Sequence, residues 1–330
     1  MRLVQILRRD GSRAVGIAES ARALRLVAGE TSTRELGLQA YHTHRSIEEL
    51  VRGQLSDEVE DYDCASRELR ILPPVDHPDP AHLLISLTGL THLGSAQPRD
   101  DMHADGNGHD GPTDTMKMFK LGLRGGRPEP GRVGAQPEWA YKGDGSTLVP
   151  PGRPIELPDY AEDGGEEAEV AGLYVVADDG TPLRLGFAIG NEYSDHVLEK
   201  RNYLYLAHSK LRQCSLAPEM LLGELPADFS GDIEISRDDR IVWSGRFRSG
   251  SERMCHSIAN LEHHHFKYSQ FRRPGDVHVH FFGASLLSYS SGLVIRPGDS
   301  IRIAAREFGR PLVNPIVSKA QTAPVRVRVL

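Results

Sequence analysis

Apolar and polar residues alternate along the first 30 positions of the chain. The runs RLVQIL, RAVGIA and RALRLV show this alternation, and RRDGS stands between the first two as a turn. A period of two is typical of strands that bury one face. The pattern therefore predicts a small antiparallel sheet in the N-terminal part.

A helix is predicted next, around SIEELVRGQL. Ser46 and Glu49 stand three residues apart there, which is the spacing of a capping box at a helix start. Further helical stretches are predicted near 196–212 and 251–266. The other strand-like runs are EAEVAGLYVV, PLRLGFAIG, DIEISRDDRIVWSGRF, DVHVHFFGASLL and DSIRIAARE. We therefore predict an α+β chain that is mainly β.

Two stretches interrupt these elements. RILPPVDHPDP, residues 70–80, carries four prolines and is typical of a linker. Residues 86–145 are rich in Gly, Pro and Asp, and within them TDTMKMFKLGL predicts one short helix; loops of this length are often functional. We predict a small N-terminal domain at 1–80, a linker and lid region at 81–145, and a larger domain at 146–330.

Composition narrows the class of protein. The 330 residues are 39% hydrophobic and carry a formal net charge of -7, with both signs interspersed, which argues against a general nucleic-acid binder. The chain shows no signal peptide and no apolar run near the ~20 residues of a membrane span, so we expect a soluble, cytoplasmic protein. Cys64, Cys214 and Cys255 are widely separated, and we expect buried or half-buried thiols rather than disulfides.

The sequence argues against several familiar sites. The chain contains no GxSxG, GxxxxGK[ST] or GxGxxG motif after a strand. The loop DMHADGNGHDGP resembles a calcium loop, but Pro112 stands where the bidentate Glu belongs. Five histidines lie in EHHHFKYSQ and DVHVHFF, without the spacing of an HExxH helix. We expect these histidines to be surface residues or supports for a neighbouring site.

Carboxylates gather on two successive strands. In GEEAEVAGLYVV, strand alternation places Glu167 and Glu169 on the face of Ala171, where unpaired charges would be costly. The next predicted strand ends at Glu192. Acidic strand ends are common without a ligand, but two adjacent strands can bring these three carboxylates together. Three oxygen ligands with open positions suit Mg²⁺ or Mn²⁺, which would neutralise the buried charges.

The motifs resemble those of a known family. PEWAYKGDGSTLVPPGRPIELPDYAEDGGEEAEVAGLYVV, GFAIGNEYSD, HSKLRQCSLAPEM, RPGDVHVHFFGASL and GLVIRPGDSIRI follow one another in that order. Over about residues 137–315 the chain is similar to the C-terminal domain of the fumarylacetoacetate hydrolase family. The resemblance implies a mixed β-sandwich or roll beside the small N-terminal sheet, and a homodimer formed through the C-terminal domain.

The resemblance also implies roles for individual residues. The family's metal ligands fall on Glu167, Glu169 and Glu192, where Glu192 replaces the usual Asp. Its two motif lysines fall on Lys210 and on Lys142, the latter in the substrate site. Its Thr-Gly-Thr-Pro turn, which faces the substrate carboxylate, corresponds most nearly to Phe282–Ser285. Ala284 lacks the expected hydroxyl, so that role passes to Ser285 or is absent.

One departure concerns the lid. The family's His and Glu pair, which activates water in its C–C hydrolases and decarboxylases, is replaced by GLTHLGSAQPRDDMH. The chain is therefore more similar to the branch acting on 2-keto-3-deoxy sugar acids, which includes dehydratases of pentose oxidation. The candidates in the lid for a leaving-group acid or for hydroxyl recognition are His92, Arg99, Asp100 and His103.

These assignments predict a Mg²⁺- or Mn²⁺-dependent hydro-lyase that converts 2-keto-3-deoxypentonate to 2,5-dioxopentanoate. Mg²⁺ would be chelated by the C1 carboxylate and C2 carbonyl, a base would remove a C3 proton, and the C4 hydroxyl would leave. Lys210 serves either as the base or as the partner of the enolate. The alternatives are a hydrolase or decarboxylase of an acylpyruvate-like 2-oxo acid, and a 2-oxo acid binding protein without catalysis.

Overall fold

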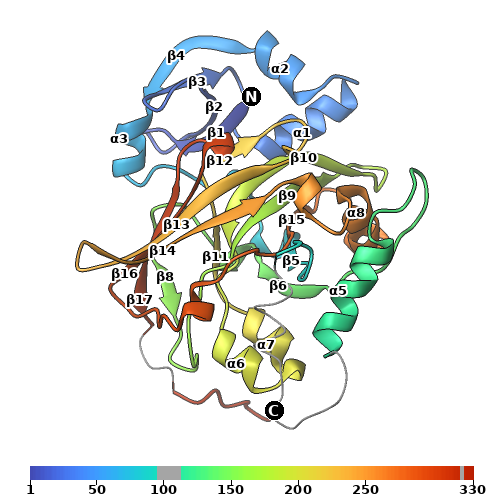
Figure 1. Ribbon diagram of the computed structural model, residues 1–330. Coiled ribbons are helices and arrows are strands. Elements are labelled where there is room, and N and C mark those ends of the chain that lie inside the picture. Colours follow the sequence, from blue (N-terminus) through green and yellow to red (C-terminus); the bar gives the residue numbers. More distant parts are fainter. Residues whose placement is uncertain (95–112, 320–322) are drawn as a thin grey trace.

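The computed structural model describes residues 1–94, 113–319 and 323–330, and the strands of this part form two sheets (Figure 1). The larger sheet has the order β4 (Leu55–Asp61), β3 (Ala23–Val27), β2 (Arg13–Ala18), β1 (Arg2–Leu7), β12 (Glu219–Leu221), β10 (Pro182–Asn191), β9 (Ala168–Val176), β15 (Val277–Phe281), β5 (Leu83–Leu87) and β6 (Ala140–Asp144). Beside β10 it also includes β11 (Cys214–Leu216) and then β7 (Leu148–Val149). The smaller sheet has the order β14 (Arg240–Ser249), β13 (Phe229–Arg237), β16 (Asp299–Ala305), β17 (Leu312–Ser318) and β8 (Ile155–Leu157).

Helices are few in this part of the chain, so the prediction of a mainly β, α+β fold is confirmed. They are α1 (Thr33–His42), α2 (Ile47–Gly53), α3 (Tyr62–Arg67), α5 (Asp114–Gly125), α6 (His196–Arg201), α7 (Leu206–Lys210) and α8 (Ile258–Phe266). The capping box predicted from Ser46 and Glu49 is present at the start of α2. No helix among the described residues has both the length and the hydropathy to cross a membrane.

The antiparallel N-terminal strands are part of the larger sheet. β1 pairs with β2 and, on its other side, with β12, where Leu3 faces Met220. The sheet therefore continues from the N-terminal part into the strands that follow residue 146. The division at residues 80 and 145 stays a prediction.

β9 and β10 lie at the centre of the molecule and are buried on both faces. On one face Val170, Phe187 and Ile189 pack against the smaller sheet. On the other, Ala171 and Leu173 belong to the core cluster that also includes residues of α1. The acidic residues stand at the start of β9 and at the end of β10. Because the two strands are antiparallel, these two strand ends lie side by side.

Two strands lie in the region for which the sequence pattern predicted loops and one helix. The helix is present as α5, but β5 and β6 flank it as strands of the larger sheet. β5, with the sequence LLISL, lies parallel to β15 and is buried, so its apolar run does not alternate. β6, with the sequence AYKGD, is extended because it pairs with β5. This strand carries Lys142 toward the interior.

Candidate metal centre

The structure brings Glu167, Glu169 and Glu192 together. Glu169 lies in β9, Glu167 directly precedes β9, and Glu192 directly follows β10. Gly190 faces Glu169 in the ladder, and the Glu192 amide donates to the Glu167 carbonyl at 2.9 Å. Each side chain is buried, and one carboxylate oxygen from each lies within 4.8 Å of the others. This group could therefore hold a metal ion.

Two buried lysines reach the same carboxylates. Lys142 Nζ lies 2.5 Å from Glu192 Oε1 and donates to the carbonyls of Tyr193 and Lys210 at 2.7 and 3.0 Å. Lys210, at the end of α7, donates to Glu167 Oε1 and lies 3.2 Å from Glu192 Oε2. Both side chains are fully buried. The lysines thus neutralise much of the negative charge that the carboxylates bring into the core.

Sequence reasoning missed three polar residues beside this centre. Ser194 Oγ donates to Glu192 Oε1 at 3.1 Å, and His196 Nε2 donates to Glu167 Oε1 at 3.1 Å. Glu199 Oε2 lies 3.5 Å from Lys210 Nζ. All three are buried and follow β10 within SDHVLE. In the sequence, polar residues follow directly after an apolar strand. The prediction used only the first acidic residue among them, Glu192.

The turn after β15 holds one of the carboxylates. Gly283 N donates to Glu169 Oε2 at 2.7 Å. Its φ is +92°, and a Cβ there would lie 2.6 Å from Thr91 Oγ1, so glycine is required at this position. Ser285 is turned elsewhere, because its hydroxyl donates to the Arg248 carbonyl at 2.9 Å. The turn therefore contacts the centre through its backbone rather than through Ser285.

Electrostatics favour a cation at the three carboxylates. Burial, followed by the charges of Glu192 and Glu167, raises the pKa of Glu169 well above its usual value. Burial also raises the pKa of Glu192, although Lys142 and Lys210 oppose this. Within the described part of the chain, Glu192 Oε2 accepts no hydrogen bond, although Lys210 Nζ lies 3.2 Å from it. The donor set consists of carboxylate oxygens, so the residues fit Mg²⁺ or Mn²⁺.

Another buried carboxylate, that of Glu166, has a separate environment. Both of its oxygens accept hydrogen bonds from Ser288, at 2.7 Å from the amide and 2.5 Å from the hydroxyl. The Glu166 carboxylate is thus held by Ser288, whereas the Glu167 carboxylate bonds His196 and Lys210. Glu166 is a natural control for substitutions at the three clustered carboxylates.

Of the predicted lid residues, Arg99, Asp100 and His103 lie outside the described residues. His92 is fully buried, and its Nε2 forms a hydrogen bond with Ser249 Oγ at 2.8 Å. Burial lowers the pKa of His92 to about 4, so its imidazole is neutral at physiological pH. His92 and Ser285 line one cavity of ≈ 370 Å³.

The histidines of α8 and β15 differ from expectation. His263 is exposed, but the other four histidines are buried, so the expectation of surface residues is wrong for His264, His265, His278 and His280. Trp139 Nε1 donates to His265 Nδ1 at 3.2 Å, and His265 Nε2 therefore donates to His278 Nδ1 at 3.0 Å. His280 bonds the hydroxyls of Ser86 and Thr88. The cluster is a neutral hydrogen-bonded layer under Trp139.

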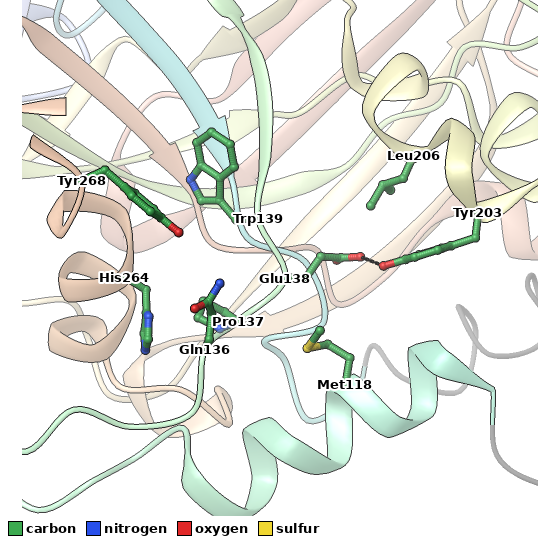
Figure 2. A pocket seen from close by; sticks show the side chains of 9 residues that line it. All are labelled: Met118, Gln136, Pro137, Glu138, Trp139, Tyr203, Leu206, His264 and Tyr268. Atoms are coloured by element: carbon green, nitrogen blue, oxygen red, sulfur yellow. Dashed lines mark hydrogen bonds between the residues drawn. The ribbon is translucent and has the colours of Figure 1, made fainter. Parts of the chain in front are cut away.

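A second cavity, of ≈ 330 Å³, opens along the segments that carry the two lysines (Figure 2). Glu138 and Trp139 line it just before β6, and Tyr203 and Leu206 line it just before Lys210. Glu138 is buried, and Figure 2 shows it pointing toward Tyr203, whose hydroxyl donates to Glu138 Oε1 at 2.8 Å. The other lining residues are Met118, Gln136, Pro137, His264 and Tyr268. Sequence reasoning missed Glu138, although it stands inside PEWAYK.

Comparison with known proteins identifies the fold. No protein-family model and no curated protein sequence matches the chain. Among solved structures, a hexagonal crystal form of 2-keto-3-deoxyarabinonate dehydratase is 17% identical, with a TM-score of 0.71 over 97% of this chain and 100% of that one. 2-Keto-3-deoxy-D-arabinonate dehydratase complexed with magnesium and 2,5-dioxopentanoate has the same identity and coverage, with a TM-score of 0.70.

A second kind of enzyme is more distantly similar. 5-Carboxymethyl-2-hydroxymuconate delta-isomerase from Mycobacterium smegmatis is 18% identical, with a TM-score of 0.59 over 97% of this chain and 100% of that one. At these identities the likeness establishes the fold. The chain thus folds like these dehydratase and isomerase structures, which supports the fumarylacetoacetate hydrolase-like fold implied by the sequence motifs.

Proposed function

We propose that this chain is a metal-dependent hydro-lyase of a 2-keto-3-deoxy sugar acid and converts 2-keto-3-deoxypentonate to 2,5-dioxopentanoate. The observation that carries the proposal is the buried group of Glu167, Glu169 and Glu192 with two buried lysines beside it. Support comes from a fold similar to that of a dehydratase bound to magnesium and 2,5-dioxopentanoate. An Mg²⁺ or Mn²⁺ ion held by the three carboxylates would supply Lewis acidity toward the C1 carboxylate and C2 carbonyl of the substrate.

The reaction removes one water. A C3 proton is lost, the C4–O bond breaks with protonation of the leaving hydroxyl, and a C3=C4 double bond forms in conjugation with the C2 ketone. A proton then leaves C5 and another is added at C3, which moves the double bond to C4=C5. The resulting C5 enol gains a proton at C4 and loses its hydroxyl proton, which gives the C5 aldehyde. The chain must therefore hold a developing enolate, accept one proton and deliver another.

We propose that Lys210 stabilises the enolate. Its Nζ lies among the carboxylates of Glu167, Glu192 and Glu199. An ammonium suits the stabilisation of negative charge on the substrate better than it suits the removal of a C3 proton. Lys142 acts as a positioning residue, because it bonds Glu192 and two backbone carbonyls.

Glu138 is our candidate for proton transfer at the leaving hydroxyl. It is the carboxyl that lines the cavity beside the lysine segments, and Tyr203 orients it. His92, whose imidazole is neutral, is proposed to recognise substrate hydroxyls from the lid. Arg99 and His103 are proposed to contribute there as acids or through the same recognition. Ser285 stays a proposed contact for the substrate carboxylate, which would require its hydroxyl to leave the Arg248 carbonyl.

Product analysis tests the proposal. Metal-stripped protein is supplied with Mg²⁺ and each enantiomer of 2-keto-3-deoxypentonate, and the products are followed by mass spectrometry and an aldehyde probe. We expect one enantiomer to lose one water and gain an aldehyde, with activity lost in Glu169→Gln, lowered in Glu138→Gln and retained in Glu166→Gln. Cleavage into pyruvate-sized fragments would instead support the C–C hydrolase, and no reaction of either enantiomer would overturn the pentonate assignment.

A further inference from the structure

The pairing of β9 with β10 continues past the ends of both strands. Gly165 and Ser194 form a bridge in the same antiparallel register as the two strands. Strand alternation therefore places the side chains of Asp163 and Glu167 on the same face as position 165. In this register His196, the first residue of α6, stands opposite Asp163.

Gly165 leaves the space that the imidazole of His196 occupies. A Cβ added to Gly165 would lie 2.1 Å from His196 Nδ1, so Nδ1 lies directly against the main chain there. The other ring nitrogen, Nε2, bonds Glu167 Oε1 at 3.1 Å. Nδ1 is therefore the nitrogen that is left for a second partner, on the face that it shares with Asp163.

Two buried atoms on this face have no hydrogen-bond partner among the described residues. They are His196 Nδ1 and Asp163 Oδ1, and both residues are buried. A buried polar atom without a partner is costly. Ordered water commonly supplies the missing bond when two such groups are too far apart to bond directly.

The spacing and the hydrogens of one water suit these two atoms. A bridging water holds its partners roughly 5–6 Å apart, because each hydrogen bond is about 2.8 Å long. Asp163 and Gly165 are two residues apart, which is roughly 7 Å in a strand, and Nδ1 lies over Gly165. Asp163 Oδ1 accepts one hydrogen of the water, and Nδ1 accepts the other or, in the imidazolium, donates to the water oxygen.

We propose that Asp163 is a positioning residue of the metal centre and holds His196 against Glu167 through one buried water. The ring is then bonded at both nitrogens, which fixes its orientation and with it the direction of the Glu167 carboxylate. Groups that orient metal ligands from behind tune metal affinity in the same way. This inference rests on the metal centre of the proposed function and not on its substrate.

NMR of metal-free protein with ¹⁵N-labelled histidine tests the contact itself. His196→Ala assigns the ring signals, and we expect Asp163→Ala to shift the Nδ1 resonance of His196. Tyr193→Phe is the matched control, because the Tyr193 hydroxyl is also buried and unbonded among the described residues but lies against Gly164, on the opposite face. This variant should leave the resonance in place. A resonance that Asp163→Ala does not move would overturn the proposal.

Calorimetric titration of metal-stripped protein with Mg²⁺ tests the consequence. Asp163→Ala should weaken binding about tenfold, whereas Asp163→Asn keeps an acceptor oxygen and should retain most of the affinity. In a His196→Ala background, Asp163→Ala should cause no further loss, because its effect passes through the ring.

The outcomes separate this role from the metal centre itself. Wild-type affinity in Asp163→Ala, or a tenfold loss that persists in the His196→Ala background, would contradict the positioning role alone. Absence of Mg²⁺ binding by the wild type would refute the metal centre, and the positioning role with it.

Discussion

Replacing Lys142 with methionine removes a buried ammonium and keeps the aliphatic side chain. In the wild type, Nζ bonds Glu192 and the carbonyls of Tyr193 and Lys210, and no part of the side chain is exposed. The variant leaves a buried carboxylate without this partner and two carbonyls without this donor. Water has no access to replace them. We therefore expect Lys142→Met to destabilise the metal-free protein.

The magnitude follows from the geometry. Breaking a buried ion pair by removing one partner costs about 3–5 kcal/mol, against a total stability of about 5–15 kcal/mol. Mg²⁺ would neutralise Glu192 in place of the lysine. A ligand at a hundred times its Kd stabilises the folded state by about 2.7 kcal/mol, so saturating Mg²⁺ should recover part of the loss.

Urea unfolding with and without Mg²⁺ measures both effects. Lys319→Met is the control, because Lys319 forms an exposed ion pair with Glu156 at 2.8 Å and its removal should leave stability unchanged. If metal-free Lys142→Met were as stable as the wild type, Lys142 would not be holding a buried charge. If Mg²⁺ stabilised both proteins equally, the link between Lys142 and the metal ligands would be wrong.

Three further results are expected. Gly283→Ala should cost about 2–4 kcal/mol in urea unfolding, because φ is +92° and the new Cβ would meet Thr91; an unchanged midpoint would contradict the required glycine. Burial lowers the pKa of His278 to about 4, so as the pH falls this histidine takes up a proton in the unfolded chain before it does so in the folded one. Between pH 6.5 and 4 the wild type should therefore lose about 3 kcal/mol of stability relative to His278→Phe. A stability difference that does not change with pH would refute this. His196→Ala should weaken Mg²⁺ binding about tenfold by releasing Glu167, as measured by calorimetry, and an unchanged affinity would show that the hydrogen bond does not position this carboxylate.

Local patterns predicted the elements that alternate or carry a cap. β1, β2 and β10 follow apolar alternation or long apolar runs, and α2 follows its capping box. β5 and β6 were missed because their extended form depends on pairing with distant strands. β17 contains Pro315, and a proline within a run of residues argues against a strand. In the structure, Pro315 nevertheless lies in β17, opposite Ser300 of β16.

At the metal centre too, local sequence patterns predicted some residues, while others depend on contacts between distant parts of the chain. Glu167, Glu169 and Glu192 were found because two neighbouring strands carry them at the same end. Glu138 and Glu199 were missed because their partners, Tyr203 and Lys210, are brought near by loops whose course has no local signature. Ser285 was predicted from motif position alone, and its orientation is set by the Arg248 carbonyl. Sequence thus located the charged centre, while tertiary packing determines which side chains surround it.

Calorimetric titration of metal-stripped protein with Mg²⁺ tests the central claim most directly. We predict one site per chain in the wild type, its loss in Glu169→Gln, and its retention in Glu166→Gln, whose carboxylate is held by Ser288 instead. Equal Mg²⁺ binding by Glu169→Gln and the wild type would contradict the assignment of these three carboxylates as the metal centre.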